Sequence, residues 1–150
     1  MQKKAMEKTI KIKYHSDKID RLCYIDGKSD WIDLRAAKEY HLAAGDFALI
    51  DLGISVQLPE GYEMITAARS SLFKNYGLIQ TNAIGVIDET YCGDDDVIRM
   101  PVYAVRDTVV HINDRVCQFR IIEHQPRIRF EEVKSLGNAA RGGFGSTGRQ

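Results

Sequence analysis

Short runs rich in β-branched and aromatic residues, separated by turn-forming residues, recur along most of the chain. Alternation is clear in Ile10–Tyr14 and Val116–Ile122, where every second side chain would face a core. Pro59–Gly61 predicts a tight hairpin turn between two such strands. The long helical patterns that a parallel α/β sheet needs between its strands are missing. We therefore expect an all-β sandwich or closed barrel. The expected strands are Thr9–Tyr14, Phe47–Leu52, Ile54–Leu58, Tyr62–Ala67, Leu78–Thr81, Val97–Val105, Val116–His124 and Ile128–Val133.

Helix is indicated in only two stretches, Arg35–Tyr40 and a single turn at Ser70–Asn75 whose first Ser is able to cap it. The length of 150 residues suits one domain. The last fourteen residues differ from the rest, because five are Gly and only Phe144 is large and apolar. By composition this segment is a disordered tail. We expect one domain over residues 1–136 and a flexible tail over residues 137–150.

The charge balance limits the kind of partner. Lys plus Arg and Asp plus Glu are both 21, so no whole-chain basic field is available to bind DNA or RNA. A small anionic ligand needs only a local cluster of donors. No run approaches the roughly 18 apolar residues of a membrane span. The three cysteines, Cys23, Cys92 and Cys117, form no CxxC pair and have no His at zinc-site spacing. We expect reduced, mostly buried thiols in a cytoplasmic protein.

Two segments contain residue types suited to nucleotide chemistry. Asp88 lies in a hydrophobic strand and is followed by a turn and Tyr91. It is either a turn residue that accepts backbone N–H bonds or a general base that activates water. Arg69 offers a planar fork to phosphate oxygens, while Ser70 and Ser71 offer hydroxyls and N–H groups at a helix start. The alternative for this second segment is an ordinary helix cap preceded by a surface Arg.

Five segments, taken in chain order, form a pattern. They are Asp30–Ala37, Ala68–Gly77, Thr81–Asp94, Asn113–Ile121 and Arg141–Gly148. Together they resemble, in the same order, the five motifs of the trimeric dUTPase family. The flanking sequence is similar to the dUTPases of Bacillus and its phages. Within the Ala68–Gly77 segment, Ala68 replaces the usual Pro and Ser71 the usual Gly, and the family more often places the Arg of the last segment two residues earlier, where this chain has Ala139. The resemblance implies a distorted jelly-roll β-barrel with one short helix, which assembles as a homotrimer with shared active sites.

The same resemblance implies hydrolysis of dUTP to dUMP and pyrophosphate, with Asp88 activating the water that attacks the α-phosphorus. Tyr91 would pack under the deoxyribose and exclude a 2′-hydroxyl. Asn82 would belong to the uracil pocket, which Val86 and Ile87 would line through their backbone.

Phosphate contacts are implied for Arg69, Ser70, Ser71 and Gln118. The counterpart of Asp33 in the family holds a water bound to Mg²⁺, the expected cofactor. The Gly-rich tail would close over the substrate. In it, Arg141 would approach the terminal phosphate and Phe144 would stack over uracil, with further donors from Gly145, Ser146 and Thr147.

Two alternatives remain open at this level. A dCTP deaminase shares the fold but needs its own acid–base carboxylate. A dUTPase-like module whose main role is to bind a regulatory protein would not need Asp88, Tyr91 or the Gly-rich tail to be intact.

Overall fold

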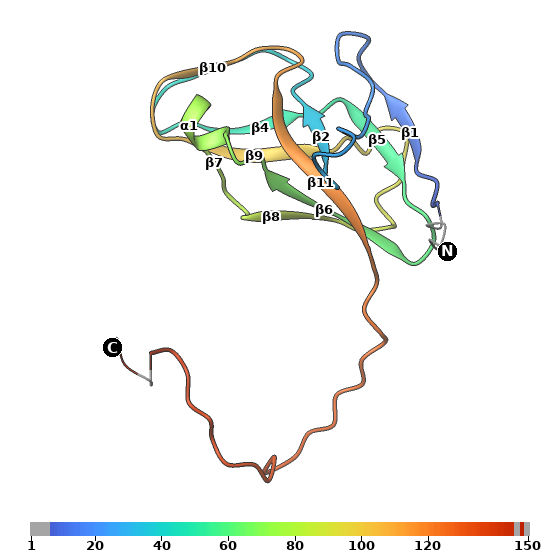
Figure 1. The fold of residues 1–150 in the computed structure, drawn as a ribbon, viewed down its shortest axis with the longest axis vertical. Coiled ribbons are helices and arrows are strands. Elements are labelled where there is room, and N and C mark those ends of the chain that lie inside the picture. The colour runs from blue at the N-terminus through green and yellow to red at the C-terminus, as the bar shows by residue number, and fades with distance from the viewer. Residues whose placement is uncertain (1–6, 146–147, 149–150) are drawn as a thin grey trace.

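Antiparallel strands and one short helix make up a computed structural model that describes residues 7–145 and 148 (Figure 1). The elements are β1 (Lys11–Tyr14), β2 (Ile32–Arg35), β3 (Tyr40–Leu42), β4 (Phe47–Asp51), β5 (Ile54–Gln57), β6 (Tyr62–Ala68), α1 (Leu72–Tyr76), β7 (Leu78–Gln80), β8 (Ile84–Ile87), β9 (Arg99–Ala104), β10 (Thr108–Val110) and β11 (Arg115–Glu123). The strand pairs are antiparallel throughout.

Four sheets enclose one apolar core. A four-stranded sheet has the order β2-β11-β6-β8 and a three-stranded sheet the order β4-β9-β7, while β1 pairs with β5 and β10 with β3. Alternate residues of the central strands face inward, as period-two patterning requires. The all-β jelly-roll prediction is confirmed. The largest fully buried side chains are Leu34, Ile50, Leu52, Ile54, Met64, Leu72, Leu78, Ile98, Met100, Val102, Val110 and Val116.

Two of the predicted elements are wrong. The stretch Arg35–Tyr40 is not a helix, because Ile32–Arg35 pairs with β11 and Tyr40–Leu42 pairs with β10. Leu34 and Ala36 are both fully buried, which is the spacing of a strand and its extension. Ile128–Val133 is not a strand, and the side chains of that segment are exposed.

The turn at Pro59–Gly61 forms, with the Tyr62 N–H donating to the Pro59 carbonyl at 3.2 Å. It does not make a hairpin, because β5 pairs with β1 whereas β6 pairs with β11 and β8. The residue types at Pro59–Gly61 therefore predicted the turn of the chain, but not which sheet the strands on either side of the turn would join.

The short helix α1 is confirmed, although Ser71 rather than Ser70 is its N-cap and makes no side-chain cap bond. Gly77 ends it with a left-handed φ of 62°, and its N–H donates to the Phe73 carbonyl at 2.8 Å. A Cβ at Gly77 would also lie 2.6 Å from Cγ of Arg106. Both constraints favour glycine at this position.

Beyond β11 the chain leaves the barrel as an extended, exposed arm (Figure 1). Phe130 is 91% and Leu136 is 82% exposed, so no described part of the chain covers these apolar groups. Among the described residues, no helix has the length and apolar character needed to cross a membrane.

The prediction of mostly buried thiols is wrong for Cys23 and Cys92, which are exposed. Cys117 is buried, and this burial raises the pKa of its thiol to about 12. All three cysteines are free.

Candidate functional site: two halves on one chain

A pocket of about 500 Å³ lies where β8 runs into the loop after it. Four of the candidate residues, Val86, Ile87, Asp88 and Tyr91, line this pocket together. The walls are otherwise largely apolar, as is usual for small-molecule sites that orient a ligand with few polar groups. The remaining lining residues are Leu49, Thr90, Val97, Ile98 and Arg99.

Asp88 begins a tight loop that its own side chain stabilises. The Thr90 N–H donates to Oδ1 of Asp88 at 2.8 Å, and the Thr90 hydroxyl donates to the same oxygen at 2.6 Å. These two bonds hold the pKa of the Asp88 carboxyl below its usual value. One carboxylate oxygen is thus fixed by the loop, which leaves Oδ2 to meet a ligand or a water molecule.

Tyr91 is held by both its backbone and its ring. Its N–H donates to the Asp88 carbonyl at 3.0 Å, and its hydroxyl donates to the Val97 carbonyl at 2.8 Å. The ring is therefore anchored at its far end, and its orientation does not depend on a bound ligand.

Asn82 lies in the turn between β7 and β8, outside the pocket lining. β8 comes last in the sheet order β2-β11-β6-β8, so it is an edge strand, and no described strand pairs with the other side of its backbone. Gly85 is required in β8, because a Cβ there would collide with the Thr66 hydroxyl. Ala83 completes the turn with a left-handed φ of 59°.

A second cluster gathers around Asp33, on β2. Oδ1 of Asp33 accepts a bond from Nε of Arg69 at 3.0 Å, and Oδ2 accepts one from Nη1 of Arg115 at 3.4 Å. Gln118 pairs with Asp33 in the β11–β2 ladder, and its Nε2 donates to the Ala68 carbonyl at 3.0 Å. The structure thus brings Asp33, Arg69 and Gln118 together. Asp33 holds the Arg69 guanidinium in place.

Ser70 and Ser71 follow Arg69 at the start of α1. Ser70 is exposed, and the Ser71 hydroxyl takes no part in capping. Two hydroxyls and a guanidinium therefore lie together in sequence beside the Asp33 cluster, which is a donor set suited to an anion.

The register of the β6–β8 ladder separates the two clusters within one chain. Ala67 faces Ile84 and Met64 faces Ile87. Arg69 therefore lies beyond one end of the ladder and Asp88 beyond the other, about 20 Å apart at roughly 3.3 Å per residue. No residue that lines the Asp88 pocket belongs to the Asp33 cluster.

The tail residues are not brought to either cluster. Arg141, Phe144 and Gly145 are all exposed, and the Phe144 ring contacts no core residue. The predicted Ser146 and Thr147 lie outside the described residues.

Three residues that matter to the site's geometry were not identified from the sequence. They are Thr90, which bonds Asp88; Arg115, which pairs with Asp33; and Gln80, whose Nε2 donates to Oδ1 of Asn82 at 2.9 Å. Only Thr90 has a local signal, since a Thr two residues after an Asp commonly bonds its side chain.

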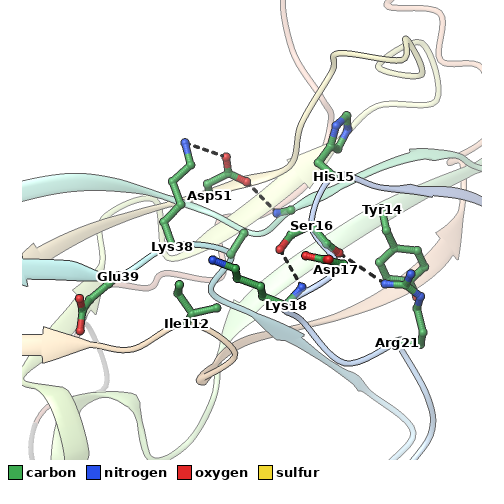
Figure 2. Close-up of a pocket in the computed structure, with 12 residues that line it drawn as sticks. Tyr14, His15, Ser16, Asp17, Lys18, Arg21, Lys38, Glu39, Asp51 and Ile112 are labelled. Carbon is green, nitrogen blue, oxygen red and sulfur yellow. Dashed lines mark hydrogen bonds and ion pairs between the residues drawn. The ribbon is translucent and has the colours of Figure 1, made fainter.

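A larger cavity, of about 630 Å³, contains none of the predicted residues (Figure 2). Its charges are largely paired with neighbours. Lys38 lies 3.5 Å from Asp51, and the Arg21 guanidinium stacks 4.0 Å from the centroid of the Tyr14 ring. Size alone therefore does not mark a site here.

Fold and site together define a β-barrel protein suited to binding a nucleotide, with a preformed carboxylate–tyrosine pocket and a separate guanidinium cluster. The dUTPase family model matches residues 21–148. The chain belongs to the dUTPase family.

Individual relatives of the chain belong to the same family. The chain is 50% identical over 139 residues to the SPbeta prophage-derived deoxyuridine 5′-triphosphate nucleotidohydrolase YosS of Bacillus subtilis, covering 93% of this chain and 97% of that one. It is 37% identical to the corresponding enzyme of Anaplasma marginale, covering 83% and 86%. These names favour a nucleotidohydrolase over the deaminase alternative.

Solved structures share the fold. A mutant dUTPase of Staphylococcus bacteriophage 80alpha, solved with dUpNHpp, aligns with a TM-score of 0.77 at 17% identity over 94% of this chain and 99% of that one. A mutant dUTPase from phage phi11 of S. aureus, described with a structural Mg(II) ion, aligns with a TM-score of 0.73 at 15% identity, covering 85% and 98%.

Proposed function

We propose that this chain hydrolyses dUTP to dUMP and pyrophosphate. The observation that carries the proposal is the preformed loop from Asp88 to Tyr91, in a chain of the dUTPase family. A carboxylate held ionised beside an anchored aromatic ring is suited to orient a water molecule against a bound nucleotide.

In the proposed reaction a water oxygen forms a bond to the α-phosphorus while the bond from that phosphorus to the bridging oxygen breaks. Pyrophosphate leaves with the electron pair, and dUMP keeps the new oxygen. Asp88 accepts the water's proton through Oδ2. The lowered pKa keeps Asp88 ionised, so its carboxylate is available both to hold the water in line and to accept the proton.

We assign selection of the sugar and selection of the base to different residues around β8. The Tyr91 ring would pack against the deoxyribose, where its fixed position leaves no space for a 2′-hydroxyl. The free edge of β8 offers the backbone of Val86 and Ile87, and Asn82 lies at the far end of the same strand. A base would thus be read by fixed backbone groups and one side-chain amide.

Magnesium is the proposed cofactor, held mainly by the substrate. Within residues 7–145 and 148, no group of three His, Cys, Asp or Glu side chains is placed to hold a metal ion. A site without such a cage is compatible with Mg²⁺, because this ion keeps several of its waters and binds through phosphates. Asp33 is the carboxylate beside the phosphate-binding residues and would contact a metal-bound water. When bound, the ion would neutralise charge that develops on the leaving pyrophosphate.

The placement of the two clusters supports a site shared between copies of the chain. A nucleotide with its base near Asn82 and its sugar near Asp88 would direct its phosphates away from Arg69 of the same chain. The Arg69, Ser70, Ser71 and Gln118 donors would therefore come from another copy, and the tail with Arg141 and Phe144 from a further one.

An uncovered apolar face supports assembly with other copies of the chain, which we propose form the homotrimer that the family resemblance implies. The outer face of the β4-β9-β7 sheet exposes Phe47 (61%), Leu49 (52%), Ile79 (46%) and Tyr103 (43%). A contiguous apolar surface of this kind, together with the apolar side chains of the exposed arm, is typical of an interface between subunits.

The free cysteines favour a reducing compartment, and we propose that the enzyme lies in the cytoplasm.

Pyrophosphate release measured across deoxynucleoside and ribonucleoside triphosphates tests this function. We expect dUTP to be hydrolysed at least tenfold faster than dCTP, dTTP or UTP at equal low concentration, since each competitor misplaces a polar or bulky group, at about 1–3 kcal/mol each. Comparable rates on dUTP and dCTP would contradict the proposed uracil pocket, and no release from dUTP would contradict the function.

A further inference from the structure

Gln80 is a buried polar residue that the fold does not need. It ends β7 on the core-facing side, opposite Val102 in the β7–β9 ladder, and is 6% exposed. Leu78, the other inward residue of the strand, is apolar, as the position requires. The Gln80 Oε1 atom is buried and has no hydrogen-bond partner among the residues that the structure describes. An unpaired buried carbonyl destabilises a fold, so an apolar residue would stabilise the barrel better here.

The other end of the same amide has a specific partner. Nε2 of Gln80 donates to Oδ1 of Asn82 at 2.9 Å. Asn82 is exposed in the turn that leads into β8, so a buried donor is aimed at the side chain of a surface residue. The Asn82 side chain lies close to Gly85: a Cβ added at Gly85 would be 3.7 Å from Nδ2 of Asn82.

This contact fixes which end of the Asn82 amide is free. A carboxamide has one acceptor oxygen and one donor nitrogen, and rotation by half a turn exchanges them. With Oδ1 engaged by Gln80, the NH₂ group is the end available to a ligand. Without that bond, Asn82 is free to present either end.

We infer that Gln80 is a positioning residue that determines base specificity by holding the Asn82 amide with its NH₂ group toward the base. Uracil has a carbonyl oxygen at C4, which accepts a bond from such a donor. Cytosine has an amino group there, which would oppose it donor to donor. A site built to bond one polar group discriminates strongly against an analogue that lacks it. This inference rests on the proposed function, in which Asn82 meets the base.

The test compares Gln80→Met with Val102→Ala. Methionine matches glutamine in length and removes the donor, and Gln80→Leu serves if the Met variant does not fold. Val102→Ala creates a small cavity beside the same position without touching Asn82. For each variant, kcat and KM are measured for dUTP and dCTP, with Kd for dUMP and dCMP and the Tm of the protein.

Gln80→Met should reduce the ratio of kcat/KM for dUTP to that for dCTP by about tenfold, the worth of one hydrogen bond of about 1.4 kcal/mol. The change should arise mainly from a higher KM for dUTP and should appear again in the dUMP and dCMP affinities. Val102→Ala should lower the Tm and leave the ratio unchanged. In an Asn82→Ala background, Gln80→Met should no longer change the ratio.

The possible failures are distinguishable. If folded Gln80→Met keeps the wild-type ratio of dUTP to dCTP, or if Val102→Ala changes that ratio as much, Gln80 is only structural and the inference is overturned. If the wild-type protein itself shows no preference for dUTP, the proposed function fails instead, whatever Gln80 does.

Discussion

Asp88→Asn is expected to fold and assemble normally while losing turnover by a factor of roughly 10²–10⁴, the usual contribution of a general base. Asparagine is nearly isosteric, and its Oδ1 can still accept the two bonds from Thr90. Its amide nitrogen cannot take a proton from water at the position of Oδ2. Steady-state dUTP hydrolysis and dUMP binding measure the two effects separately, and we expect only the first to change. A near-normal kcat in the purified variant would remove Asp88 from the catalytic role.

The pH dependence of the wild-type enzyme provides an independent check on the same residue. In the proposed reaction, activity needs the Asp88 carboxylate, whose pKa the Thr90 bonds hold below its ordinary value. Activity should therefore persist as the pH falls through the usual Asp range and be lost only below it. Thr90→Val removes the hydroxyl donor and raises this pKa, so the acid limb of kcat/KM should move to higher pH. An acid limb that does not move would mean that another group controls it.

Deleting residues 137–150 should lower kcat/KM for dUTP by about 100-fold or more and leave folding almost unchanged. The described part of the tail is exposed and contacts no part of the barrel, so its removal takes nothing from the core. Ordering a Gly-rich segment costs conformational entropy, which only strong contacts can offset. Charge-assisted hydrogen bonds to a triphosphate, at about 1.5–3 kcal/mol each, supply such contacts.

The comparison of dUMP with a non-hydrolysable dUTP analogue makes this prediction specific. dUMP lacks the terminal phosphates, so its affinity should be the same for the full-length and truncated chains. Amide exchange should show the tail protected by the analogue with Mg²⁺ and unprotected with dUMP. Phe144→Ala is the matched point variant, and it should weaken the analogue more than dUMP. Full-length turnover by the truncated chain would show that the tail is not part of the site.

The strands that could be predicted from sequence are those whose patterns are long enough to show alternation. Residues 115–123 of β11 and 62–68 of β6 are of this kind, and they form the centre of the four-stranded sheet. The short strands β2 and β3 could not be distinguished from helix, because Arg35–Tyr40 contains good helix formers. Their pairing with β11 and β10 is long-range, and such tertiary pairing overrides local propensity.

The site was predicted less evenly. Val86, Ile87, Asp88 and Tyr91 lie within six residues of one another, so their shared pocket follows from local geometry once β8 is formed. The bond between Gln80 and Asn82 depends on which face of β7 is buried, and the ion pair between Asp33 and Arg115 depends on the β2–β11 register. Neither has a short-range sequence pattern. The separation of the two half-sites likewise became visible only from the β6–β8 ladder.

Complementation between two inactive variants tests the central claim most directly, namely that dUTP is hydrolysed at sites assembled from different copies of the chain. Asp88→Asn is expected to inactivate one proposed half-site. Arg69→Ala is expected to inactivate the other, while Arg115 still pairs with Asp33. The two proteins are mixed one to one, subunit exchange is verified by mass spectrometry, and dUTP hydrolysis is measured.

A shared site takes its Asp88 from an Arg69→Ala chain and its Arg69 from an Asp88→Asn chain. Random exchange should produce that combination in roughly a quarter of the sites of a cyclic trimer, and activity should return to about that fraction of wild type. If exchanged assemblies of the two variants remain as inactive as the unmixed proteins, each site is built within a single chain, and the shared-site account is contradicted.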